Sequence, residues 1–290
     1  MTMGHGVTGS GAAGAQASGM GLPTLIAALN AKTLLFTVTS GRSGTALLTA
    51  LLRECLGIVA EHEPPPRVNF VLRSLVLAPE MAAAWLAHEK LPAMLARAAG
   101  PVYAETSHLV CKGLIEPMLD LGLRPRFIIL TRPAPEVARS LFQMNVIPGR
   151  TGAGRLVLLG PDDAGVLPVA DPDGLSDYQL CCWYAREIER RQAAYASLFQ
   201  RRGLAAFRIG MHDLTRWDRF LHLAAFAAGP APMPDEATFR TVTVRNQNPR
   251  AVASGGIADR PLPPDMEAQE AAVDAAIHAA AASPSGRGSG

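Results

Sequence analysis

A short segment rich in glycine and hydroxyl side chains, Thr39–Thr45 (TSGRSGT), has the composition of an anion-binding loop. It follows an apolar run and precedes a segment with helical character, so it lies between a strand and a helix. In such a loop the backbone N–H groups and the helix N-terminus attract an anion. Glycine lets the backbone approach the ligand, while the hydroxyls and the arginine add donors and positive charge. The candidate ligand residues are Gly41, Arg42, Ser43, Gly44 and Thr45. The alternative is an ordinary strand-to-helix turn made of small residues.

A second candidate anchor follows the apolar run Arg126–Thr131 (RFIILT). Arg132 leaves the end of this predicted strand, and Ser140 lies eight residues later on the predicted helix Pro135–Met144. An arginine at a strand end and a serine on the next helix can converge on one phosphate. The alternative is a surface arginine and a neutral helix serine.

Possible general bases also lie at strand ends. Glu63 and His62 follow a short strand candidate at residues 58–60, and His108 follows the predicted strand Val102–Thr106. Each of these side chains is also consistent with a solvated charge or a satisfied loop histidine. Lys112 is a possible ligand for anionic oxygens, or a plain surface lysine.

The elements that position these residues alternate between strands and helices. Strands are predicted at residues 34–39, 58–60, 102–106, 126–131 and 204–209, and helices at 46–55, 68–77, 81–99, 135–144, 177–202 and 217–228. Residues 149–173 are expected to form a long loop, either a lid or an acceptor-binding insertion. Alternating elements predict an α/β protein with a three-layer P-loop-type fold, in which a central parallel β-sheet is flanked by helices. Ligands bind such sheets at the carboxyl ends of the strands.

Composition separates one folded domain from two tails. Residues 1–22 are mostly small and polar, which predicts a disordered N-terminal tail, and residues 23–262 form the predicted domain. Residues 263–290 form an alanine-rich, partly disordered tail with one helix expected at 266–281. The formal net charge is only +2, which argues against a general nucleic-acid binder.

The four cysteines have no zinc-site spacing, so we expect free thiols in a reducing, cytoplasmic compartment and no bound metal. No apolar stretch of transmembrane length is present, and the N-terminus does not resemble a signal peptide.

Taken together, the two anion-binding segments resemble the sulfotransferases that use 3′-phosphoadenosine 5′-phosphosulfate (PAPS). The loop resembles the family's 5′-phosphosulfate loop, often R-S-G-T, and the Arg132–Ser140 segment resembles its 3′-phosphate motif. The resemblance covers roughly residues 33–210, but its specific part is only some fifteen residues. Two positions depart from common patterns: Pro133 replaces an Asn or Asp, and Arg42 replaces the lysine of cytosolic members, as in Golgi-type and bacterial members.

The resemblance implies further site residues. Trp183 is the candidate aromatic contact to adenine, and Arg245, within Thr243–Asn248, is a loose match to the family's late 3′-phosphate loop. The position of Glu63 resembles that of the base in tyrosyl-protein sulfotransferases. The segment containing His108 resembles the T-H-L segment of cytosolic members.

The implied activity is transfer of a sulfuryl group from PAPS, without a metal, to a hydroxyl or amine. The acceptor would be a small molecule, a lipid or a carbohydrate, and apolar residues in 64–99 and 149–173 favour a partly apolar one. One alternative is a nucleotide or metabolite kinase with a degenerate P-loop, although the GK[ST] lysine and a carboxylate after RFIILT are missing. Another is a non-catalytic nucleotide-binding protein that uses the proline-rich Glu63–Pro66 segment as a docking surface.

Overall fold

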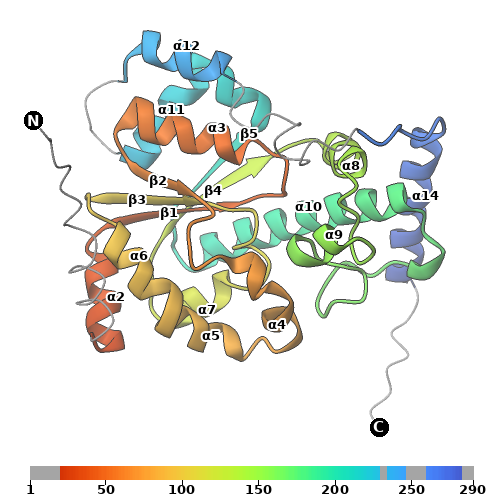
Figure 1. The fold of residues 1–290 in the computed structure, drawn as a ribbon, viewed down its shortest axis with the longest axis horizontal. Helices are drawn as coiled ribbons and strands as arrows, with labels where there is room; N and C mark the ends of the chain where they lie inside the picture. Colours follow the sequence, from red (N-terminus) through yellow and green to blue (C-terminus); the bar gives the residue numbers. More distant parts are fainter. Residues whose placement is uncertain (1–19, 229–233, 246–258, 283–290) are drawn as a thin grey trace, which may run out of the picture.

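A twisted sheet of parallel strands forms the centre of the computed structural model, which describes residues 20–228, 234–245 and 259–282. Its strands are β1 (Thr33–Val38), β2 (Val59–His62), β3 (Val102–Thr106), β4 (Arg126–Thr131) and β5 (Ala206–Gly210). They lie in the order β2-β3-β1-β4-β5, and every pairing is parallel (Figure 1). The predicted central parallel sheet is therefore confirmed.

The strand boundaries differ from the prediction only at their ends. β3 and β4 have the predicted limits, whereas β1, β2 and β5 are displaced by one or two residues. β2 continues to His62 because Glu61 and His62 pair with Glu105 and Thr106 of β3. That pairing depends on a strand more than forty residues away, so the local pattern of apolar residues does not reveal it.

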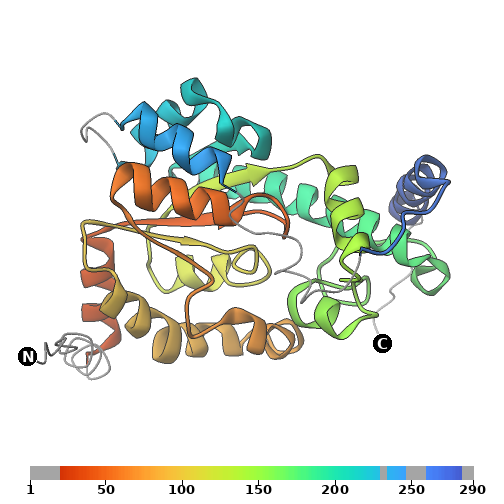
Figure 2. The same ribbon diagram turned by 45° about the horizontal axis from the view of Figure 1, so that its top comes forward.

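Helices cover both faces of the sheet. The helical segments are α2 (Leu22–Asn30), α3 (Thr45–Ala50), η1 (Leu51–Cys55), η2 (Val68–Phe70), α4 (Leu72–Leu77), α5 (Met81–Trp85), η3 (Leu86–Lys90), α6 (Leu91–Arg97), α7 (Ile115–Asp120), α8 (Ala134–Gln143), α9 (Gly152–Val157), η4 (Pro172–Gly174), α10 (Asp177–Arg201), η5 (Met211–Thr215), α11 (Trp217–Ala228), α12 (Glu236–Val244) and α14 (Met266–Ala282). Of these, α3, α11 and α12 lie on one face, whereas α2, α6, α7 and α10 lie on the other (Figures 1 and 2).

Two hydrophobic clusters occupy the spaces between the three layers. β1 contributes to both, because successive side chains of a strand point to opposite faces. Leu35 packs in the cluster that contains Leu48 of α3, whereas Leu34 and Phe36 pack in the cluster that contains Phe199 of α10. This alternation determines which face of β1 packs against α3, the helix that follows the loop.

The position of the site follows from the strand order. The chain leaves β1, passes through α3 and returns in β2, beyond β3, whereas β4 lies on the other side of β1. Connections from β1 and β4 therefore diverge at their carboxyl ends, which is the arrangement that leaves a ligand-binding crevice in an open α/β sheet. The segments after β1, β3 and β4 meet there.

The predicted long loop at residues 149–173 is wrong in part, because it contains the helix α9 and the short η4. Two glycines within α9 concealed the helix. Gly154 has a specific role, since a Cβ atom there would lie 1.8 Å from the carbonyl oxygen of Ile147. The segment after α9 is tied down: Arg73 of α4 forms an ion pair with Asp163 at 2.8 Å and donates to the carbonyl of Leu158 at 2.9 Å.

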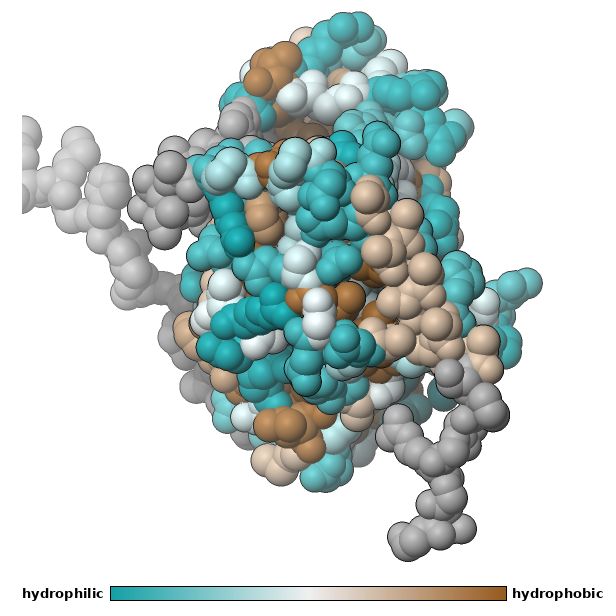
Figure 3. Space-filling model, turned by 90° about the vertical axis from the view of Figure 1, so that its right-hand side faces the viewer, coloured by the Kyte–Doolittle hydropathy of each residue, from teal (hydrophilic) through white to brown (hydrophobic). Residues whose placement is uncertain are grey.

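The predicted C-terminal helix is confirmed as α14, which extends one residue further than expected. It packs against α10 through polar contacts, including an ion pair between Arg186 and Asp274 at 2.9 Å, and through the buried Val273. Figure 3 shows a largely hydrophilic face with a light-brown ridge, the colour expected for the alanine-rich α14. The predicted tail at 1–22 lies outside the described residues as far as residue 19, and residues 22 onward belong to α2.

Candidate active site

The anion-binding loop joins β1 directly to α3, as the sequence predicts. Thr39 fixes its start by donating a hydrogen bond from Oγ1 to the carbonyl of Leu130 in β4, at 2.7 Å. Within the loop the hydroxyls of Ser40 and Ser43 lie 2.5 Å apart, and both side chains are buried. Arg42 has a φ of 66° and Gly44 a φ of 86°, so the backbone turns through the left-handed region twice before the helix begins.

Gly44 makes the turn possible, and we expect Gly44→Ala to destabilise the fold. An alanine in left-handed conformation costs about 1–2 kcal/mol, and its Cβ would also lie 3.0 Å from Cγ of Met211. Gly57 provides a matched control: its φ is 63°, yet no atom would lie within 4 Å of a Cβ there. Urea denaturation should therefore give a larger loss of unfolding free energy for Gly44→Ala than for Gly57→Ala. Equal losses would contradict the tight contact.

The two predicted anion anchors meet in space. Nε of Arg42 donates to Oγ of the buried Ser140 at 3.3 Å. Arg132 donates from Nη1 to the carbonyl of Arg42 at 2.6 Å and from Nε to Glu136 at 3.0 Å. Segments ninety residues apart thus form one cationic, hydroxyl-bearing region at the carboxyl ends of β1 and β4. Arg139 points elsewhere, as expected, and contacts Glu270 of α14 at 3.4 Å.

Glu63 and His108, which the sequence leaves as competing candidates for the base, lie together. Oε1 of Glu63 is 3.4 Å from Nε2 of His108, and Nδ1 of His108 is 2.8 Å from Nζ of Lys112. Lys112 also donates to the carbonyl of Val157 and lies over the ring of Tyr184. The segment after β2 and the segment after β3 thus supply Glu63, His108 and Lys112 in one row, which lies against α9 and α10.

The electrostatics of this row assign the tautomer of His108. Burial, with the adjacent Lys112 ammonium, lowers the pKa of His108 well below its usual value, so the imidazole is neutral. Burial also lowers the pKa of Lys112 to about 7. In the protonated state of Lys112 the ammonium donates to Nδ1, so the single ring proton stands on Nε2 and points to the Glu63 carboxylate. His108 can then orient the carboxylate by a hydrogen bond.

The row lies directly against the anion loop. A Cβ atom at Gly41 would be 3.4 Å from Nδ1 of His108, so a side chain at that position would press on the imidazole. On the other side, the hydroxyl of Tyr184 is fully buried and donates no hydrogen bond to any described residue. The N–H of Gly41 lies close enough to oppose the rise that burial causes in the pKa of the phenol. The hydroxyl therefore faces the loop as an unused donor.

A buried ion pair between Lys90 and Glu105 holds the segment that directly follows Glu63. Nζ of Lys90 is 2.9 Å from Oε1 of Glu105, and the two side chains are 6% and 1% exposed. Burial raises the pKa of Glu105, and the Lys90 ammonium opposes that rise. Lys90 also donates to the carbonyls of Pro64 at 3.2 Å and Pro66 at 3.4 Å. The position of Glu63 is thus linked to the inner part of the sheet.

We expect Lys90→Met to cost about 3–5 kcal/mol of unfolding free energy, since it leaves the Glu105 carboxylate buried without its partner. Chemical denaturation measures this loss. The double variant Lys90→Met with Glu105→Leu removes both charges and should be clearly more stable than Lys90→Met alone. A double variant as unstable as the single one would show that the ion pair does not account for the loss.

Two expected ligand residues lie away from this site. Trp183 is fully buried, and its Nε1 donates to the carbonyl of Leu167 at 2.9 Å, so it packs in the core rather than beside a nucleotide. Arg245 follows α12 and pairs with Glu54 in η1. Glu54 lies nine residues after the start of α3, about 14 Å along the helix from the loop, so Arg245 does not join the anion anchors. The rest of its motif, residues 246–248, lies outside the described residues.

The sequence did not single out Tyr184 or Lys90. Tyr184 follows Trp183, and one residue of helix turns the side chain by about 100°, so the pattern shows an aromatic pair without showing which member faces the loop. Lys90 is one of only three lysines in the chain, and its place in the predicted helix 81–99 does not show that it contacts a strand.

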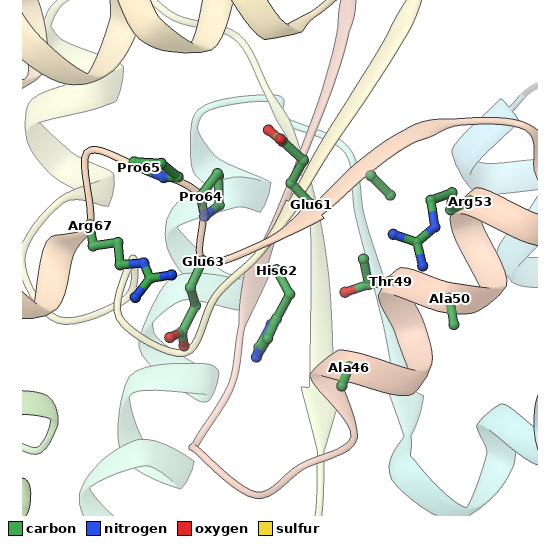
Figure 4. Close-up of a pocket in the computed structure, with 11 residues that line it drawn as sticks. Ala46, Thr49, Ala50, Arg53, Glu61, His62, Glu63, Pro64, Pro65 and Arg67 are labelled. Atoms are coloured by element: carbon green, nitrogen blue, oxygen red, sulfur yellow. The ribbon is translucent and has the colours of Figure 1, made fainter. Parts of the chain in front are cut away.

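A cavity of about 460 Å³ opens beside the row, between β2 and α3 (Figure 4). Glu63 and His62 form part of its wall, and Nδ1 of His62 lies 2.7 Å from the carbonyl of Thr106. The other lining residues are Ala46, Thr49, Ala50, Arg53, Ala60, Glu61, Pro64, Pro65 and Arg67. Within the described ranges, no three His, Cys, Asp or Glu side chains are placed to hold a metal ion. Likewise, none of the described helices has both the length and the apolar character needed to span a membrane.

Comparison with known proteins gives similarity to solved structures. No protein-family model and no curated protein sequence matches the chain. Among solved structures, it is similar to a sulfotransferase domain from the curacin biosynthetic pathway, at 13% sequence identity and a TM-score of 0.48. The alignment covers 84% of this chain and 98% of that domain.

Proposed function

We propose that the protein is a PAPS-dependent sulfotransferase that transfers a sulfuryl group to an acceptor hydroxyl. The observation that carries the proposal is the meeting of Arg42, Arg132 and Ser140 at the loop between β1 and α3. One anchor suits a 5′-phosphosulfate and the other a 3′-phosphate, and a carboxylate lies next to them. A nucleotide with a single phosphate chain would leave the second anchor without a role.

The residues present fit an anionic donor with two phosphate positions. The loop from Ser40 to Thr45 would hold the 5′ end, with Arg42 near the bridging oxygens. Arg132 and Ser140 would hold the 3′-phosphate, since guanidinium and hydroxyl groups are strong donors to phosphate oxygens. The buried hydroxyl of Tyr184, which donates to none of the described residues, faces the same loop and would donate its hydrogen bond to an anionic oxygen.

When bound, PAPS would supply an activated sulfuryl group on a good leaving group. Glu63 would accept the proton of the acceptor hydroxyl as general base. The Nε2–H of His108 would keep the carboxylate oriented, and Lys112 would keep His108 in that tautomer. Arg42 and the loop amides would stabilise the charge that develops on the leaving phosphate oxygen, and such fixed donors account for much of the catalysis in transfer reactions of this kind.

Thermal unfolding with added nucleotides tests the proposal against a kinase. Adenosine 3′,5′-bisphosphate should raise the melting temperature well above the value for the free protein, because a ligand that binds the folded state stabilises it. ATP with magnesium at the same concentration should raise it less. A larger stabilisation by ATP would favour the kinase, and a bisphosphate shift without turnover of any acceptor would favour a non-catalytic nucleotide-binding protein.

A further inference from the structure

We infer that the acceptor is a hydroxylated molecule carrying a negative charge, and that it binds in the cavity between β2 and α3 with its anionic group at Arg53. This inference rests on the proposed sulfotransferase function and adds the chemical class of the acceptor. The juxtaposition that carries it is a general base and two guanidinium groups in the wall of one cavity (Figure 4).

The cavity opens next to the anion loop, on the side of the loop where Glu63 lies. Ala46 and Thr49, in its wall, belong to the first turns of α3, whose N-terminus is the anion loop. Thr49 is four residues beyond Thr45, which is about 6 Å along the helix axis. Glu63 stands in the same wall and contacts His108, which packs against Gly41. An acceptor in the cavity would therefore present a hydroxyl to Glu63 next to the loop.

The lining of the cavity carries two guanidinium groups, Arg53 and Arg67, and two carboxylates, Glu61 and Glu63. The carboxylate of Glu61 is paired with Arg97, which lies outside the lining, at 3.1 Å, and it also accepts a hydrogen bond from Tyr103 at 2.8 Å. Glu63 contacts His108, which is neutral and does not offset its charge. With Glu61 paired, Arg53 and Arg67 face the single charge of Glu63, which leaves one positive charge in excess.

Arg53 is the better placed to bind an anion. It contacts Glu54 at 3.8 Å with 61% of its side chain exposed, and an exposed pair at that separation contributes little. Its guanidinium turns toward Thr49, whereas Arg67 belongs to the other side of the lining, on the chain that follows Glu63 and the prolines (Figure 4). A carboxylate, sulfate or phosphate on the acceptor would pair with Arg53 and leave Arg67 near the base.

The inferred acceptor class differs from the partly apolar acceptor that the sequence suggests. The apolar residues of 64–99 that prompted that expectation are divided: Leu72, Leu86 and Leu91 are in the core, whereas Phe70, Leu77 and Met81 are exposed but do not line this cavity. By contrast, the residues that line the cavity are arginines, carboxylates, a histidine and a threonine beside small alanines and two prolines. Polar lining of this kind recognises hydroxyl and anionic groups by hydrogen bonds.

Calorimetric titration with matched acceptor probes tests the inference. The full chain, saturated with adenosine 3′,5′-bisphosphate, is titrated with 4-nitrophenyl β-D-glucuronide and with the neutral 4-nitrophenyl β-D-glucoside, and likewise with 4-hydroxybenzoate and 4-hydroxybenzyl alcohol. The charged member of at least one pair should bind about tenfold more tightly or better, because it gains a charge-assisted contact. Arg53→Gln should abolish that preference. Arg202→Gln, an exposed arginine at the end of α10, serves as the control and should retain it.

Failure of the inference is distinguishable from failure of the proposed function. Charged probes that bind no more tightly than their neutral partners, including the case in which no probe binds, overturn the inference. So does a preference that survives Arg53→Gln. The proposed function is tested separately in the first step of the same titration, because a sulfotransferase must bind the bisphosphate whichever acceptor it uses.

Discussion

Replacing Arg42 with alanine should lower the rate of sulfuryl transfer by at least about 10²–10³, the usual loss on removing one preorganised donor from a transition-state anion site. The side chain of Arg42 extends from the anion loop to Ser140 at 3.3 Å, so it lies where both anchors meet. Alanine keeps a Cβ atom at this left-handed position, so the variant removes the guanidinium without relieving or adding backbone strain. Transfer is measured with labelled PAPS, and circular dichroism checks that the variant folds.

The control for this variant is Arg139→Ala. Arg139 neighbours Ser140 in α8, but its guanidinium points to Glu270 of α14 and not to the loop. We therefore expect Arg139→Ala to transfer at close to the wild-type rate. If both folded variants lose activity alike, the assignment of faces on α8 is wrong.

Glu63→Gln should lower the turnover rate by about 10²–10⁴ while leaving the affinity for PAPS nearly unchanged, because a general base contributes to the chemical step rather than to donor binding. The amide oxygen of glutamine can still accept the Nε2–H of His108, so the geometry of the pair is retained. Single-turnover kinetics separate the chemical step from binding.

The companion variant His108→Ala distinguishes a base from an orienting residue. With the tautomer assigned above, His108 holds the Glu63 carboxylate, and its loss should cost clearly less than that of the carboxylate. Full activity in Glu63→Gln together with a collapse in His108→Ala would move the base to His108. It would also show that Lys112 does not donate to Nδ1 as the 2.8 Å contact indicates.

Local patterns were sufficient to predict the sheet and the loop. β3 and β4 are short apolar runs that end at polar residues, and such runs bury both faces in a parallel sheet, so their limits could be read directly. The loop after β1 is predictable because its glycines and hydroxyls are contiguous in the sequence and together have the composition of an anion-binding turn. The same holds for Arg132 and Ser140, which lie on one strand-helix unit.

Properties that depend on distant contacts were not predictable. The sequence offered Glu63 and His108 as rivals, and only the fold places them 3.4 Å apart, with Lys112 as the third member. Trp183 lies in the core, which its sequence position does not reveal, because an aromatic residue on a long helix looks the same whether it faces a ligand or the core. Arg245 pairs with Glu54, and its motif match carries no information about where α12 packs.

Isothermal titration with adenosine 3′,5′-bisphosphate and with adenosine 5′-phosphate tests the central claim, that Arg132 and Ser140 bind a second phosphate of one nucleotide, most directly. Loss of a charge-assisted contact costs about 1.5–3 kcal/mol, so the bisphosphate should bind about 10- to 150-fold more tightly. Ser140→Ala should reduce that ratio and leave the affinity for the 5′-phosphate almost unaltered. Equal affinity of the wild-type protein for the two nucleotides would contradict the account.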